Sequence, residues 1–154
     1  ENPGGKEGQS WEVDKEIVRG VMDNVMHKYD VIGLFCDVAF WEADVDRWRQ
    51  MYGEKLLIKA TTKHATAYDM RSHQGDTVKA AEALNRALVD GTLPHNGDLA
   101  LRRHVLNARL RANRWEVTFG KETRESPKKV DLLAAWTLAN MSRNRVLAED
   151  ILSK

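Results

Sequence analysis

The chain has 154 residues, of which 42% are hydrophobic and 31% charged, and its formal net charge is +1. This length and apolar content suit one globular domain with a buried core and exclude a disordered protein. No apolar run reaches the roughly 18–20 residues that a membrane-spanning helix needs, so we expect no membrane partner. We expect a single domain over residues 1–154, in which the Gly-rich residues 1–10 form a flexible lead-in.

The sequence begins Glu-Asn-Pro-Gly-Gly, with neither an initiator Met nor a signal peptide. Processing or trimming would explain this start, but we expect excision from a longer protein. The single cysteine, Cys36, lies within an apolar run and is expected to pack as a small buried hydrophobe, which suits a reducing cytoplasm.

Charge is distributed unevenly along the chain. Residues 1–60 hold 8 Lys and Arg against 12 Asp and Glu, whereas residues 96–145 hold 11 Lys and Arg against 5 Asp and Glu. A near-neutral total therefore conceals a basic C-terminal half, which is the footprint that a phosphate-backbone partner requires. For any single basic cluster, a solvated helix face explains the charge about as well.

In the N-terminal part, apolar residues at spacings of three and four predict an amphipathic helix over residues 14–28, capped by Asp14. The continuous apolar run 31–36 predicts a strand buried on both faces, as in a parallel sheet. Gly33 would let a neighbouring element pack closely against this strand. Asp37 follows at its carboxyl end, where open α/β sheets build their sites.

The rest of the chain continues to alternate helices with short strands, which favours an α/β fold. Residues 61–75 contain few apolar side chains and are interpreted as a loop with some helical turns. Asp76 and Asp98 are expected to cap helices. The predicted helices span 41–52, 76–89, 98–110 and 127–147, and the predicted strands span 56–58 and 114–119.

Asp37 and Asp131 are the candidate metal ligands and catalytic residues. A carboxylate at a strand end and another on a packed helix can converge on one divalent cation, which prefers oxygen ligands. Each residue also has an ordinary explanation, since strand-end Asp residues form Asx turns and first-turn Asp residues favour the helix dipole. Two-metal nuclease chemistry normally needs at least three carboxylates, and the sequence nominates two.

Basic residues near these carboxylates are candidate contacts to DNA phosphates. The alternative for the first group is a solubilising loop, and some arginines of the second group must face solvent because their helix needs a polar side. The first group precedes Asp131 and consists of Lys121, Arg124, Lys128 and Lys129. The second group consists of Arg102, Arg103, Arg109, Arg111 and Arg114, and Arg102 and Arg103 are its candidate DNA contacts.

Three ordered groups of short motifs, covering about residues 11–147, carry a resemblance to a known family. The first group is Phe35-Cys36-Asp37-Val38-Ala39-Phe40-Trp41, Asp46-Arg47-Trp48 and Tyr52-Gly53. The second is Asp90-Gly91-Thr92-Leu93, His95-Asn96-Gly97-Asp98 and His104-Val105-Leu106-Asn107-Ala108. The third is Lys121-Glu122, Ser126-Pro127-Lys128-Lys129-Val130-Asp131 and Ala134-Ala135. Together they resemble the C-terminal nuclease domain of tailed-bacteriophage terminase large subunits, although Val38 stands where such sequences often have Pro.

The resemblance implies a ribonuclease-H-like α/β fold, present here in part, with a small mixed sheet flanked by helices. It implies an endonuclease that depends on Mg²⁺ or Mn²⁺ and cuts concatemeric double-stranded viral DNA in the host cytoplasm during virion assembly. It also implies three partners besides DNA: the terminase ATPase domain, the small terminase subunit and the portal. In the family's pattern, Asp37 matches the second acidic metal ligand and Asp131 the third.

The family's first acidic ligand lies on an opening strand for which this sequence has no counterpart. We therefore expect a partial nuclease domain that cleaves poorly as this fragment. Two other interpretations stay open. One is a non-catalytic DNA-binding or assembly module of the packaging motor, and the other is an α/β domain that binds a small molecule.

Overall fold

The computed structural model describes residues 12–123 and 125–151. Contacts divide the chain into two compact units, one ending at Ile32 and one beginning at Gly33. Our prediction of one domain over residues 1–154 stays a prediction, and the lead-in predicted at residues 1–10 lies outside the described residues. Within the part that is described, no helix combines the length and the apolar character needed to cross a membrane.

The N-terminal unit contains helix α2, Lys15–Lys28. The predicted cap is confirmed, because Asp14 Oδ1 accepts a hydrogen bond from the Glu16 N–H at 2.9 Å. This bond satisfies one of the backbone donors that the first turn of a helix leaves free. Tyr29 ends the helix with its N–H on the Val25 carbonyl.

The C-terminal unit contains a pair of parallel strands, β1 at Cys36–Asp37 and β2 at Ala67–Tyr68. Parallel pairing around Asp37 is confirmed, although the strand is shorter than the apolar run 31–36. The strand predicted at 56–58 is reduced to one isolated parallel bridge between Gly33 and Ile58.

The helices of this unit agree with the predictions in number and differ mainly at their ends. Asp98 caps its helix as predicted, since its side chain accepts from the Leu101 N–H at 2.7 Å. Asp76 is not a cap, because the helix already begins at Gln74 after His73. The helices are α3 Glu42–Tyr52, a 3₁₀ turn η1 Gly53–Lys55, α4 Gln74–Val89, α5 Leu99–Asn107 and α6 Asp131–Ala148.

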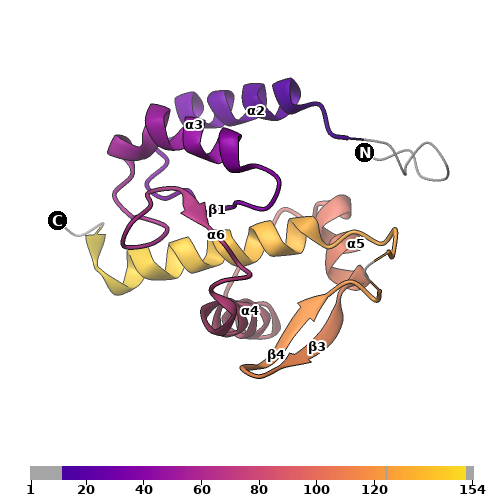
Figure 1. The fold of residues 1–154 in the computed structure, drawn as a ribbon. Coiled ribbons are helices and arrows are strands. Elements are labelled where there is room, and N and C mark those ends of the chain that lie inside the picture. The colour runs from indigo at the N-terminus through magenta and orange to yellow at the C-terminus, as the bar shows by residue number, and fades with distance from the viewer. Residues whose placement is uncertain (1–11, 124, 152–154) are drawn as a thin grey trace. The chain divides into compact units, whose positions relative to one another are not determined.

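A β-hairpin replaces part of a predicted helix. Strands β3, Arg109–Asn113, and β4, Glu116–Gly120, pair antiparallel, so α5 ends at Asn107 and not at residue 110. The strand predicted at 114–119 corresponds to β4, which begins later than predicted, at Glu116. The hairpin packs against α4, and Figure 1 shows it beside that helix.

Helix α6 organises the C-terminal unit, because α4, α5 and β1 all contact it (Figure 1). Its residues Leu138 and Met141 join a buried cluster with Ala60, Tyr68 and Ala80. The close approach predicted at Gly33 is confirmed, since a Cβ there would collide with the Ser142 hydroxyl oxygen. The described residues combine helices and strands, as the α/β prediction requires, but their strands form two separate two-stranded sheets, one parallel and one antiparallel, and not the one mixed sheet that was expected.

Candidate functional site

Asp37 lies at the carboxyl end of β1, next to the point where β2 also ends. Its strand partner is Tyr68, so Asp69 directly follows the end of the neighbouring strand. The Met70 N–H donates to Asp37 Oδ1 at 3.4 Å. Two carboxylates therefore leave adjacent parallel strands at the same edge, as the topology of such sheets favours.

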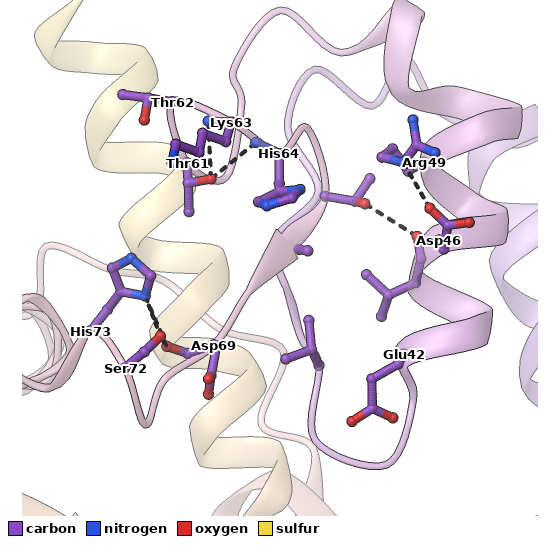
Figure 2. Close-up of a pocket in the computed structure, with 14 residues that line it drawn as sticks. Glu42, Asp46, Arg49, Thr61, Thr62, Lys63, His64, Asp69, Ser72 and His73 are labelled. Carbon is purple, nitrogen blue, oxygen red and sulfur yellow. Dashed lines mark hydrogen bonds and ion pairs between the residues drawn. The ribbon is translucent and has the colours of Figure 1, made fainter.

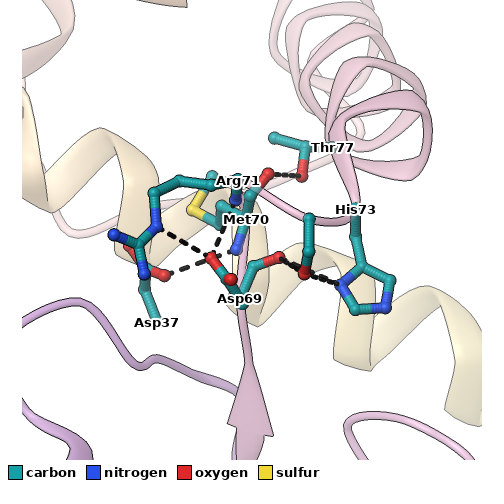
Figure 3. A network of polar contacts seen from close by, with 7 residues as sticks. Asp37, Asp69, Met70, Arg71, His73 and Thr77 are labelled. Atoms are coloured by element: carbon teal, nitrogen blue, oxygen red, sulfur yellow. Dashed lines mark hydrogen bonds and ion pairs between the residues drawn. The ribbon is translucent and has the colours of Figure 1, made fainter.

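Arg71 supplies positive charge at this edge (Figure 3). Its Nε donates to Asp69 Oδ1 at 3.0 Å, and its backbone N–H donates to the same oxygen at 3.0 Å. The hydrogen bond to Asp69 and the charge of that carboxylate raise the pKa of Arg71, with further contributions from Asp37 and Glu42. The Arg71 guanidinium is thus hydrogen-bonded to one carboxylate, Asp69, and interacts electrostatically with two more, Asp37 and Glu42.

The ionised form of Asp69 is favoured in turn. Desolvation opposes ionisation, but hydrogen bonds from the side chain and backbone of Arg71 outweigh it and lower the pKa of Asp69. The sequence analysis missed both residues because it interpreted 61–75 as a loop. The available signal was Ala67-Tyr68-Asp69, a short strand followed by Asp like Cys36-Asp37.

Asp131 is the first residue of α6, and its side chain is exposed. The next residue is held from another helix, because the Leu132 N–H donates to His104 Nδ1 of α5 at 3.0 Å. This bond assigns a structural role to His104. Since α6 contacts β1, the structure places the elements that carry Asp37 and Asp131 against each other. Convergence of the two carboxylates on one cation stays a prediction.

The donor atoms at this edge suit a hard divalent cation, because Mg²⁺ and Mn²⁺ favour carboxylate oxygens. The number of side chains that could bind the cation is too small for a complete site. Among residues 12–123 and 125–151, no three His, Cys, Asp or Glu side chains gather where they could hold a metal ion. The described residues therefore do not complete a metal site by themselves.

The predicted DNA-binding residues lie around the start of α6 and on α5. Lys128 Nζ forms a 3.4 Å ion pair with Glu122, and the Lys129 carbonyl accepts from Asn107 Nδ2 at 2.9 Å. Since α5 contacts α6, its exposed arginines belong to the same part of the unit. Arg102, Arg103 and Lys128 are exposed, Lys121 and Lys129 are half-buried, and Arg124 lies outside the described residues.

A pocket of about 610 Å³ lies between α3 and residues 61–64, and Asp69 is among the residues that line it. Figure 2 shows polar side chains around it, including the Asp46–Arg49 ion pair with a Nε–Oδ1 distance of 2.9 Å. Hydrogen bonds from Arg49 and Gln50 lower the pKa of Asp46. None of the residues predicted to bind metal or DNA lines this pocket.

Two phage proteins are similar to this chain. Each is named "Gene 13 protein", one from Mycobacterium phage D29 and one from Mycobacterium phage L5, and each is 34% identical to it over 137 residues. The matched region covers 88% of this chain and 23% of each relative, so the chain spans about a quarter of their length. No protein-family model matches the chain, and no solved structure matches it.

Proposed function

We propose that this chain is part of the nuclease domain of a bacteriophage DNA-packaging terminase and that it has a ribonuclease-H-like fold. The observation that carries the proposal is the placement of Asp37. It ends one of two parallel strands, and that strand packs against the helix that begins with Asp131. Two acidic residues on such elements could supply two of the three or more carboxylates that two-metal nuclease chemistry normally needs.

Similarity to phage proteins supports the biological setting. The matched region makes up 23% of each mycobacteriophage relative, which suits a domain within a longer phage protein. In this proposal the partners are double-stranded DNA, a terminase ATPase domain, the small terminase subunit and the portal. The reaction would take place in the host cytoplasm during virion assembly.

Each group of residues has a distinct task in the proposed reaction. Asp37 and Asp131 would be ligands of Mg²⁺ or Mn²⁺, which supplies an activated water and charge neutralisation when bound. The remaining carboxylate would come from outside the described residues, because no third ligand gathers within them. Exposed basic residues on α5 and before α6, such as Arg102 and Lys128, would hold DNA phosphates.

The direct test is nicking of supercoiled plasmid by the purified chain in the presence of Mn²⁺. We expect slow nicking that EDTA abolishes. Asp37→Asn and Asp131→Asn should each reduce the rate by about 100-fold or more, because each removes a charged ligand and keeps the shape of the side chain. Asp46→Asn is the matched control, since Asp46 is an exposed carboxylate on α3, paired with Arg49 and not among the proposed ligands, and it should leave the rate unchanged.

Equal nicking by the wild-type chain and both variants would refute the assignment of Asp37 and Asp131. If only one variant lost activity, the shared-cation arrangement would be wrong.

A second candidate function is a non-catalytic DNA-binding or assembly module of the packaging motor. It is favoured by the missing third ligand among the described residues. This function predicts salt-sensitive DNA binding with no nicking at any Mn²⁺ concentration. Binding without cleavage, retained in Asp37→Asn and Asp131→Asn, would select it over the nuclease.

A further inference from the structure

A second pocket, of about 530 Å³, lies where the start of α4 meets the turn between β3 and β4. Its lining includes three permanently charged cations, Arg71, Lys79 and Arg114, and two carboxylates, Asp76 and Glu82. The cations come from three different segments of the chain, so the pocket exists only in the folded unit. Arg114 belongs to the second basic group of the sequence, but none of the residues that line the pocket is among the candidate DNA contacts.

An aromatic contact holds one of the cations in place. The Arg114 guanidinium carbon lies 5.0 Å from the centroid of the Trp115 ring, within the range of a cation–π interaction. The indole packs against α4 at Gly75, where an added Cβ would lie 3.4 Å from two ring atoms. An arginine held on an aromatic face loses less side-chain entropy when it binds an anion, and its planar fork matches phosphate oxygens.

The backbone at this end of α4 also favours an anion. The residue before the helix, His73, makes no side-chain hydrogen bond to the first turn. The positive end of the dipole of a 16-residue helix therefore faces the pocket region without a side-chain cap. Asp76 lies in this first turn and Glu82 farther along, and both would repel a phosphate.

Arg71 connects the pocket to the candidate site. It lines the pocket, and it is also hydrogen-bonded to Asp69 and within electrostatic reach of Asp37. Figure 3 shows its side chain beside Asp37 and Asp69. Arg71 therefore borders both the candidate site and the pocket, so the two adjoin each other on the unit.

We propose that the pocket between α4 and the β3–β4 turn binds a backbone phosphate of double-stranded DNA through Arg114 and Lys79, beside the candidate site at Asp37. The proposal rests on the proposed function, because that function supplies the DNA. It adds a phosphate contact on the α4 side of the unit to those predicted on α5 and before α6.

The experiment measures the affinity of the chain for a short fluorescent DNA duplex by anisotropy, in EDTA and at several salt concentrations. Arg114→Gln and Lys79→Gln should each weaken binding about three- to tenfold and reduce the slope of log affinity against log salt by about one. Glu82→Gln should tighten binding, because it removes a repulsive charge from the same pocket. Lys55→Gln is the control, since exposed Lys55 lies on η1 and outside both pockets.

Each of three results would overturn the proposal. The first is binding by Arg114→Gln and Lys79→Gln that equals wild-type binding. The second is weaker binding by Glu82→Gln, and the third is a loss of affinity in Lys55→Gln as large as in the pocket variants. A fourth arm uses inorganic phosphate as a competitor. If the pocket bound only the free anion and not DNA, millimolar phosphate would leave the duplex affinity unchanged, and this result also contradicts a DNA contact.

The outcomes separate this proposal from the proposed function. If the chain binds the duplex in a salt-dependent way and the pocket variants bind equally well, the pocket proposal is wrong but the proposed function stands. If the wild-type chain does not bind the duplex, both proposals are wrong.

Discussion

Phe40 adopts a left-handed backbone conformation, with φ of 68°, in the turn that follows β1. The Trp41 N–H closes this turn by donating to the Val38 carbonyl at 2.9 Å. Phe40 is 86% exposed, so burial of its side chain repays little of the roughly 1–2 kcal/mol that this conformation costs an L-residue. Strained residues of this kind recur at functional sites, and Phe40 lies three positions after Asp37.

Phe40→Asn should stabilise the protein by roughly 0.5–1 kcal/mol, because Asn tolerates the left-handed conformation and does not add the chain entropy of Gly. Thermal denaturation would show this as a rise in Tm of about 1–4 °C for a chain of this size. Phe40→Ala removes the ring without relieving the backbone and should change Tm little. Equal Tm values for the two variants would mean that the backbone of Phe40 is not strained.

Cys36 is the one cysteine of the chain, and burial raises the pKa of its thiol from 9.0 to about 12. At pH 8 the native thiol should therefore react with a disulfide reagent about 1000-fold more slowly than in denaturant, because the thiolate is the reactive form. The stabilising effect of the neutral thiol is complete below pH 9 and is lost as pH rises from about 9 to about 12. Fast labelling of the native chain at pH 8 would show that the Cys36 thiol is not buried.

At the scale of elements, local signals predicted the features that depend on neighbouring residues. Asp14 and Asp98 cap helices through bonds to residues two and three positions on, so their roles could be inferred from sequence. The start of α6 could not be inferred from neighbouring residues. It begins at Asp131 and not near Pro127, and the Leu132 N–H in its first turn is bound by His104 of another helix.

Short strands were the elements most often missed, for the same reason. Strand β2 has only two residues, and the Cys36 N–H of β1 donates to the carbonyl of Thr66, the residue before β2, at 2.8 Å. No local pattern requires this pairing, because it is determined by contacts between distant segments. The consequence for the candidate site is specific: Asp37 could be predicted from the apolar run before it, whereas Asp69 and Arg71 depended on recognising β2.

At the scale of the whole molecule, the proposed function depends on contacts between segments far apart in the chain. Helix α6 contacts β1, α4 and α5, and it thereby connects the strand end at Asp37, the helix start at Asp131 and the arginines of α5. The basic residues of α5 therefore lie on an element that contacts α6, whereas those of the β3–β4 hairpin lie on an element that contacts α4. Charge distribution was predictable from composition, but its relation to the two acidic residues required the fold.

In the proposed function Asp37 and Asp131 bind one shared cation, and nuclear magnetic resonance with Mn²⁺ can detect whether they do. The Met70 amide donates to Asp37, and the Leu132 amide follows Asp131, so each reports on one carboxylate. We predict that substoichiometric Mn²⁺ broadens both amide signals with the same concentration dependence, and that Asp37→Asn and Asp131→Asn each abolish both effects. Broadening of the two signals at different Mn²⁺ concentrations, or loss of only the nearer signal's response in each variant, would contradict the claim.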